Sequence, residues 1–319
     1  MHLNSKSYEK KYRKYKSKYK ILKIIIGGDC DPLPNPEEED LATTKNLLDL
    51  CPTERITIQD KCYEVKGLYR WMITDNKSIL PGIQKKITEE EKQKIIQAYE
   101  ELVPIILTRE KLIKIYPNLQ QETNINLSYK RYTDIALGTF INLPNLRTLI
   151  LNNNKIKKLQ PNIFNNLPAL VCLNLGNNKI QELQPSIFDN LPRLERLYLH
   201  DNQIRELPIG IFNNLENLQI LNLDNNQIRE LQLDTFNNIP RLKELYLEYN
   251  QIRELQPGIF NNLPRLTYLF FNDNQIQELQ TGVFNNLPAL RYLMLFNNQI
   301  QDLPTGVFNK LPTGIDIRI

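Results

Sequence analysis

The chain has 319 residues, of which 41% are hydrophobic and 24% are charged, and its formal net charge is +4 at pH 7. This is the composition of an ordinary globular protein with ample material for a core, and its length suggests about two domains. Four cysteines and two histidines are too few and too scattered for a disulfide framework or a zinc site. The scarcity of cysteine favours a reducing, intracellular compartment.

Positive charge is concentrated at the N-terminus. Residues 1–23 contain eight lysines and Arg13 against a single acid, Glu9, so the rest of the chain is mildly acidic. Clustered lysines with interleaved tyrosines can bind nucleic acid or another anionic surface, and this tail is the part of the chain for which we expect such a partner. The alternative is a solubilising extension, and we predict a basic disordered tail over residues 1–28.

No segment of the sequence predicts a membrane span. The longest early apolar stretch, Ile21–Ile26, is interrupted by Lys23 and is too short to cross a bilayer. A signal peptide would need a small-residue cleavage site after this stretch, and none follows it. We therefore expect a protein that is not secreted and that acts in the cytoplasm.

Residues 29–118 differ in composition from the basic tail before them and from the part of the chain that follows. Residues 29–40 are rich in proline and acids and are predicted to form a linker, whereas residues 41–118 are predicted to form a small helical or α+β module. Residues 88–91 form a capping box, and apolar residues then recur at helical spacing until Pro104. A second short helix is expected over residues 109–116.

Part of this module, residues 50–88, resembles the U-box and RING-like domains of ubiquitin ligases. The resemblance rests on the order of Cys51-Pro52, Cys62–Val65, Leu68–Trp71 and Leu80-Pro81. It implies that Trp71 and Pro81 contact a ubiquitin-conjugating enzyme while the rest of the chain recruits a substrate. The alternative for this module is a purely structural role.

A period of 24 residues dominates the chain after residue 118. Seven units fill residues 143–310 with the frame L-x-x-L-x-x-L-x-L-x-x-N-x-I-x-x-L, and a phenylalanine follows in each unit. The asparagine slot is filled in every unit, by Asn154, Asn178, Asn202, Asn226, Asn250, Asn274 and Asn298. Seven copies in register make this pattern far more specific than a short motif.

The frame has a physical explanation. The two leucines of L-x-L share one face of a short strand, and stacked units place these strands side by side in a parallel sheet. The asparagine amide can satisfy inward-pointing backbone groups of the following turn, which would otherwise be buried without partners. A repeat of 24 residues leaves little room for an α-helix, so extended or 3₁₀ segments are expected on the convex side.

These units resemble the typical 24-residue class of the leucine-rich-repeat family, over residues 119–319. The resemblance implies an α/β repeat solenoid, curved and right-handed, with a parallel sheet on its concave side. Residues 119–142 are predicted to be an N-terminal capping repeat in which Lys130 replaces the asparagine, and residues 311–319 a C-terminal partial repeat.

The outward positions of the strands indicate where a partner binds, because core packing does not dictate them. Aromatic residues and methionine gather in the later units, which is typical of the core of a protein interface. The candidate protein-binding residues are Tyr198, Tyr246, Tyr249, Tyr268, Phe270, Tyr292, Met294 and Phe296. The alternative is that the strand propensity of aromatic residues explains this enrichment. We predict a monomer that binds a protein partner on the C-terminal half of the concave sheet.

Catalysis is not expected. The sequence has no phosphate-binding loop and no nucleophile motif, and His200 is interpreted as a surface residue. An acidic ladder recurs at the repeat period and comprises Glu182, Glu206, Glu230, Glu254, Glu278 and Asp302. We interpret it as a solvated convex edge rather than as a metal site. No enzyme activity, metal or cofactor is therefore predicted.

The chain as a whole resembles leucine-rich-repeat proteins of giant DNA viruses that infect amoebae. The features that carry this resemblance are the lysine- and tyrosine-rich tail, the asparagine- and isoleucine-rich composition and the near-identical repeats. The resemblance implies that the protein acts in the cytoplasm of a host cell.

Overall fold

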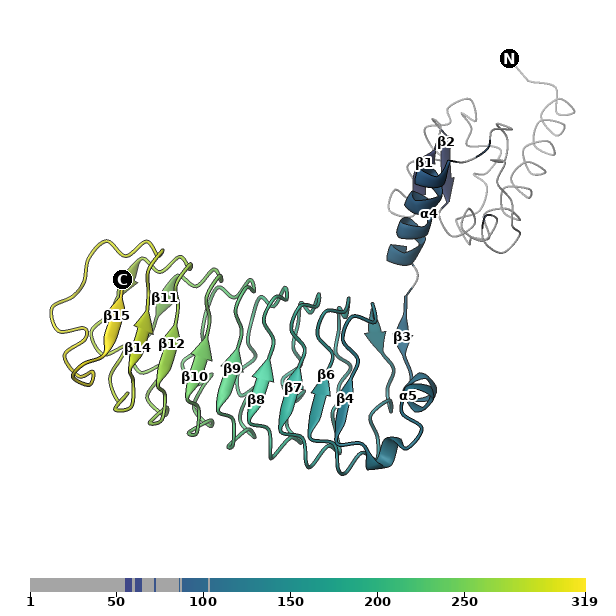
Figure 1. Cartoon of the computed structure of the whole chain (residues 1–319). Coiled ribbons are helices and arrows are strands. Elements are labelled where there is room, and N and C mark those ends of the chain that lie inside the picture. Colours follow the sequence, from purple (N-terminus) through teal and green to yellow (C-terminus); the bar gives the residue numbers. More distant parts are fainter. Residues whose placement is uncertain (1–54, 59–60, 65–71, 73–85, 87, 103) are drawn as a thin grey trace, which may run out of the picture. The chain divides into compact units, whose positions relative to one another are not determined.

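The computed structural model describes residues 55–58, 61–64, 72, 86, 88–102 and 104–319 (Figure 1). The chain forms two compact units, Met1–Pro104 and Ile105–Ile319. The predicted tail and linker lie outside the described residues, as do Trp71 and Pro81.

The described part of the N-terminal unit contains a hairpin and a helix. Strands β1 (Arg55–Ile58) and β2 (Lys61–Glu64) pair antiparallel. Helix α4 (Glu89–Leu102) begins at the predicted capping box, and Ile95 on this helix is fully buried. Both strand and helix are therefore present in the segment that the sequence predicts to be a small module.

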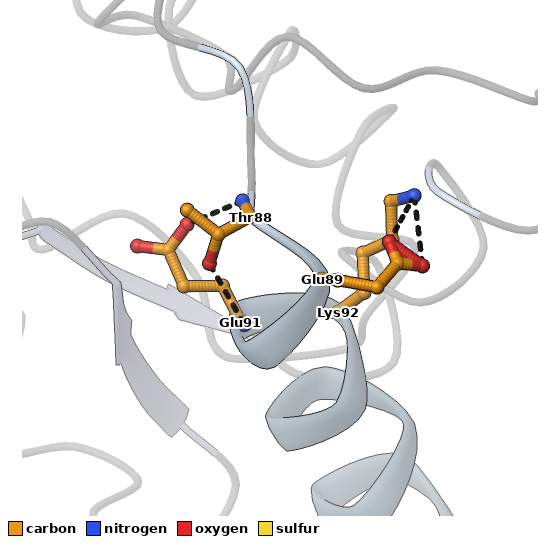
Figure 2. A network of polar contacts seen from close by, with 4 residues as sticks. All are labelled: Thr88, Glu89, Glu91 and Lys92. Carbon is orange, nitrogen blue, oxygen red and sulfur yellow. Dashed lines mark hydrogen bonds and ion pairs between the residues drawn. The ribbon is translucent and has the colours of Figure 1, made fainter.

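The capping box consists of two reciprocal hydrogen bonds between Thr88 and Glu91 at the first turn of α4 (Figure 2). The backbone N–H of Thr88 donates to Oε2 of Glu91 at 2.8 Å, and the backbone N–H of Glu91 donates to Oγ1 of Thr88 at 3.2 Å. Lys92 forms an ion pair with Glu89 at 2.8 Å. Acidic side chains in the first turn also interact favourably with the positive end of the helix dipole. Together with the capping box, they explain why the helix starts here.

A parallel sheet of nine strands runs through the second unit, with one strand from each repeat (Figure 1). Each strand residue pairs with its equivalent in the next repeat, as Leu197 does with Leu221. From one edge to the other the strands are β4 (Asn124–Asn126), β6 (Thr148–Ile150), β7 (Cys172–Asn174), β8 (Arg196–Tyr198), β9 (Ile220–Asn222), β10 (Glu244–Tyr246), β12 (Tyr268–Phe270), β14 (Tyr292–Met294) and β15 (Asp316–Arg318). The register confirms the repeat frame predicted from the sequence.

The returning segments of the repeats contain turns and extended backbone instead of α-helix. Over residues 124–319 the structure has no helix, and the short strands β11 (Glu254–Leu255) and β13 (Glu278–Leu279) pair in parallel. The predicted α/β repeat solenoid with an extended convex side is therefore confirmed.

The solenoid unit begins earlier than the sequence suggests. Strand β3 (Ile106–Leu107) pairs in parallel with β5 (Asp134–Ile135) of the capping repeat. Helix α5 (Arg109–Ile115) and the 3₁₀ helix η3 (Leu119–Gln121) follow, and Leu112 of α5 joins the core of the repeats. The boundary between the two units therefore lies after Pro104, whereas the sequence pattern placed it after residue 118.

Two columns of apolar side chains form the core. The leucines of the strands are buried in every full repeat, as Leu197 and Leu199 are with no exposed surface. Opposite them, a phenylalanine column runs along the array and comprises Phe140, Phe164, Phe188, Phe212, Phe236, Phe260, Phe284 and Phe308. The ring of Phe236 stacks between two neighbours, with centroid distances of 6.4 Å to Phe212 and 6.2 Å to Phe260. Each repeat therefore buries its apolar face against the next one.

The side-chain amides of the repeated asparagines form hydrogen bonds to backbone groups of their own repeat and of the preceding repeat. Nδ2 of Asn226 donates to the carbonyl oxygens of Leu223 in its own repeat and Leu199 in the preceding repeat, both at 3.0 Å. Its Oδ1 accepts a hydrogen bond from the backbone N–H of Ile204 at 3.0 Å. The predicted role of this amide in satisfying buried backbone groups is thus confirmed.

We expect Asn226→Ala to lower the free energy of unfolding by about 1–3 kcal/mol, because buried carbonyl and N–H groups lose their partners. Urea denaturation followed by circular dichroism measures this change. Glu230→Ala is the matched control, since this carboxylate is exposed in the same repeat. A loss below about 0.5 kcal/mol, equal to that of the control, would contradict the assigned role of the asparagine.

Candidate functional site

The outer face of the nine-stranded sheet, here called the sheet face, carries the side chains that alternate with the buried leucines. In β8, for example, Leu197 is buried while Arg196 and Tyr198 are half-buried. Corresponding side chains of successive repeats form columns, since adjacent parallel strands lie about 4.8 Å apart. The sheet face is the surface that the sequence predicts to be concave and to bind a partner.

Four of the predicted residues form one contiguous group, the aromatic cluster, made of Tyr246, Tyr268, Phe270 and Tyr292. The rings of Tyr268 and Tyr292 stack with centroids 4.9 Å apart and an interplanar angle of 4°. Phe270 lies 5.2 Å from Tyr246 and 6.2 Å from Tyr268. The structure therefore brings these four rings together on three adjacent strands, and Tyr292 remains 37% exposed.

The other four predicted residues lie around or away from this cluster. Met294 pairs with Phe270 across β12 and β14, and Phe296 follows β14 in a half-buried position. Tyr249 is 59% exposed in the turn after β10. Tyr198 lies two strands before Tyr246 and contacts His200 edge-on, with centroids 6.2 Å apart.

A pair of carboxyl groups lies beside the aromatic cluster and was not singled out by the sequence. Asp224 and Glu248 fill the same outward slot in adjacent repeats, two residues after the ends of β9 and β10. The backbone N–H of Glu248 donates to Oδ1 of Asp224 at 3.0 Å. Oε2 of Glu248 is buried and has no hydrogen-bond partner. Two acids in one slot of successive repeats are the signal that could have revealed the pair.

Burial and the adjacent Glu248 carboxyl raise the pKa of Asp224 to about 9. Two carboxylates this close in a poorly hydrated position cannot both ionise at low cost. Asp224 therefore keeps its proton at neutral pH.

His200 occupies the same slot one repeat earlier and extends the column of titratable groups. It is half-buried rather than a freely exposed surface residue, its Nδ1 atom has no hydrogen-bond partner, and burial lowers its pKa. Its ring covers Gly176, where a Cβ atom would lie only 2.4 Å from the imidazole. A larger side chain at position 176 would therefore displace the ring of His200.

Charges are unevenly distributed over the sheet face. The second and third residues after each strand form two columns, which begin at residues 152 and 153 and recur every 24 residues. These two columns contain four acids, Asp201, Asp224, Glu248 and Asp273, and no lysine or arginine between residues 152 and 297. Tyr246 lies two residues before Glu248 of this acidic edge, and its hydroxyl donates to Oε2 of Glu244 at the start of β10 at 2.8 Å. Burial and this carboxylate raise the pKa of Tyr246.

The sequence matches the family model described as leucine rich repeat over residues 123–180, 144–204, 170–228, 192–252, 240–300 and 271–313. The chain belongs to the leucine-rich-repeat family. Arrays of this family typically serve as interaction scaffolds rather than as enzymes, since their stacked repeats offer an extended binding surface. No curated protein matches the chain.

Solved leucine-rich-repeat structures share this fold. A leucine-rich-repeat protein of Leptospira interrogans is 24% identical with a TM-score of 0.51, over 70% of this chain and 62% of its own. Internalin C2 of Listeria monocytogenes is 26% identical with a TM-score of 0.50, over 66% of this chain and 82% of its own. The TLR13–ssRNA13 complex gives 26% identity and a TM-score of 0.60, over 74% of this chain and 35% of TLR13.

The acidic ladder on the returning segments of the leucine-rich repeats is a solvated edge. Its six side chains are exposed, and Glu254 lies opposite Glu278 in the β11–β13 pair. Nε of Arg229 donates to Oε1 of Gln251 in the next repeat at 3.2 Å. Among the described residues, no three His, Cys, Asp or Glu side chains come together as a metal-binding group.

The described helices include none that is long and apolar enough to span a membrane.

We expect Asp224→Asn to stabilise the leucine-rich-repeat unit by about 1–3 kcal/mol at pH 8. The raised pKa of Asp224 means that the folded protein retains a proton that the unfolded chain releases, so stability is lost as the pH rises from about 4 towards 9. Asparagine removes this loss and already fills the equivalent slot as Asn152 and Asn272.

Urea denaturation at about pH 4 and pH 8 measures this effect. The gain in the free energy of unfolding should be large at pH 8 and small near pH 4, where wild-type Asp224 is protonated in the folded protein and partly protonated in the unfolded chain. Equal stability of variant and wild type at pH 8 would show that the carboxyl pair does not lower the stability of the folded protein.

Proposed function

We propose that the chain is a non-enzymatic interaction protein that binds a protein partner on the sheet face through the aromatic cluster. The observation that carries this proposal is the contiguity of four partly exposed rings on β10, β12 and β14. Core packing does not require aromatic residues at these outward positions, because the buried leucines and phenylalanines already fill the interior. Clustered aromatic side chains on a surface commonly provide most of the binding free energy of a protein interface.

A protein is favoured over a nucleic acid as the partner of this face. The TLR13 structure is described as a complex with single-stranded RNA, so a nucleic acid is the partner of at least one protein of this fold. Here, however, the acidic edge formed by Asp201, Asp224, Glu248 and Asp273 runs along the sheet face and would repel phosphate groups. The scarcity of cysteine in the sequence further favours action in a reducing, intracellular compartment.

Affinity capture with the full chain as bait tests this function. A partner captured by the wild type should be lost with Tyr268→Ala and retained with Glu230→Ala, a matched change of an exposed side chain outside the sheet face. Loss with the second variant but not with the first would place the partner on the returning segments and reject the proposal. Treatment of the captured complex with ribonuclease distinguishes a bound RNA from a protein.

A second candidate function is recruitment of a ubiquitin-conjugating enzyme by the N-terminal unit. The observation that favours it is the antiparallel hairpin β1–β2, which precedes Trp71 as a hairpin precedes the helix of a U-box. Incubation of the protein with ubiquitin, activating enzyme and a panel of conjugating enzymes tests this function. We expect no chain formation. Chains that form with the wild type and disappear with Trp71→Ala would establish the ligase function instead.

A further inference from the structure

The geometry points to a cationic side chain of the partner, an arginine, that docks between the carboxyl pair and the aromatic cluster. This inference rests on the proposed function, because it names the chemistry by which a protein partner is recognised on the sheet face. Asp224 and Glu248 would accept hydrogen bonds from the guanidinium group, and Tyr246 would lie against its plane.

The carboxyl pair and the aromatic cluster are adjacent on the sheet. Glu248 follows Tyr246 by two residues, so both side chains project from the same face of the chain after β10. Tyr246 in turn contacts Phe270 at a centroid distance of 5.2 Å. A planar, delocalised cation can stack on an aromatic ring and bind two carboxylate oxygens at once, which a compact ammonium group does less well.

Folding does not require the two acids. The same slot holds a neutral asparagine at Asn152 and Asn272, and both repeats have the same strand register as their neighbours. Oδ1 of Asn152 in this slot is also buried without a hydrogen-bond partner, so what distinguishes Asp224 and Glu248 is that two carboxyl groups occupy adjacent positions of a poorly hydrated slot. Local features that cost stability are commonly retained at functional sites, where a ligand compensates for them.

The surroundings of the pair are acidic or neutral. His200 precedes Asp224 in the column, and its lowered pKa keeps it uncharged at pH 7. The acidic and phenolic groups around the slot on the neighbouring repeats include Tyr198, Asp201, Glu244, Tyr246, Tyr249 and Asp273. The nearest cations of these repeats lie at the opposite ends of the strands, where Arg196 approaches Glu195 at 3.9 Å and Lys243 donates to Gln219 at 2.9 Å. No cation of the described repeats neutralises the pair, so a partner can supply one.

A metal ion fits this site less well. Asp224 and Glu248 are two ligands without a third acidic or imidazole group in place, since no set of three such side chains among the described residues forms a metal-binding group. Anionic ligands are disfavoured by the acidic edge. A cationic side chain, by contrast, needs only two carboxylates and gains from the neighbouring ring.

Selection from a displayed library of random 12-residue peptides, with the full chain as target, tests the inference. We expect the retained peptides to share an arginine or lysine next to apolar or aromatic residues. Binding of a selected peptide, measured by fluorescence anisotropy, should weaken about 10- to 100-fold when its arginine is replaced by the neutral isostere citrulline. Asp224→Asn and Glu248→Gln should weaken the arginine peptide similarly, and Glu230→Gln should not.

The pH dependence provides a readout that a purely structural role would not produce. Because the pKa of free Asp224 is about 9, binding of a cation at pH 7 releases a proton, so affinity should rise up to about tenfold per pH unit towards pH 9. Asp224→Asn should abolish this rise.

The inference is overturned if no cation-bearing peptide is enriched on the wild type relative to Asp224→Asn, or if affinity does not change with pH. Peptides that depend on Tyr268 but are indifferent to Asp224→Asn would leave the proposed function standing and reject the cation site alone. Peptides that are indifferent to both variants would reject the two together.

Discussion

Phe236→Ala should lower the free energy of unfolding by about 3–5 kcal/mol. The Phe236 side chain is 1% exposed and stacks between Phe212 and Phe260, so its removal opens a cavity lined by three successive repeats. The neighbouring rings cannot close this cavity, because each is held in register by its own strand and asparagine. The loss should therefore include both the transfer free energy of the ring and the cost of the remaining cavity.

Urea denaturation followed by circular dichroism measures this loss, with Phe236→Leu as the control that keeps most of the apolar volume. The leucine variant should lose clearly less stability than the alanine variant. A loss below about 1 kcal/mol for Phe236→Ala would mean that the column is not the continuous core seen in the structure.

Tyr268→Ala should weaken binding of the captured partner about 30-fold or more. Tyr268 stacks on Tyr292 at 4.9 Å and contacts Phe270 at 6.2 Å, so its removal breaks the continuity of the aromatic cluster. Since the side chain is only half-buried in the free protein, the fold should tolerate the change.

Isothermal titration of the partner against each variant measures this effect, and thermal denaturation verifies that the variants are folded. Glu230→Ala should change the dissociation constant less than about twofold, because solvated charges contribute little. Weak dependence on Tyr268 together with strong dependence on Arg229 would move the binding site to the exposed edge of the returning segments.

The repeat architecture could be predicted almost completely from the sequence. A strict period converts each position of the frame into a column in space, so the roles of Leu197, Asn226 and Phe236 follow from the pattern of one repeat. Outward positions follow from the same alternation, which is why Tyr268 and Tyr292 could be expected to lie together.

Other features depend on tertiary surroundings that a local pattern does not contain. The helical spacing of α5 indicates a helix but not which unit it joins, and the pairing of β3 with β5 decides that question. The carboxyl pair was overlooked because Asp224 and Glu248 read as ordinary surface acids. The raised pKa of Asp224 results from burial and from contact with Glu248 of the next repeat.

Hydroxyl-radical footprinting of the full chain with and without its captured partner tests the central claim most directly, because it reports the solvent access of individual side chains. Binding at the sheet face predicts reduced oxidation of Tyr268, Tyr292 and Met294 in the complex. Ile209 and Leu233, which are 71% and 46% exposed on the returning segments, should remain equally reactive. Protection of Ile209 and Leu233 with unchanged oxidation of Tyr268 and Tyr292 would contradict binding at the aromatic cluster.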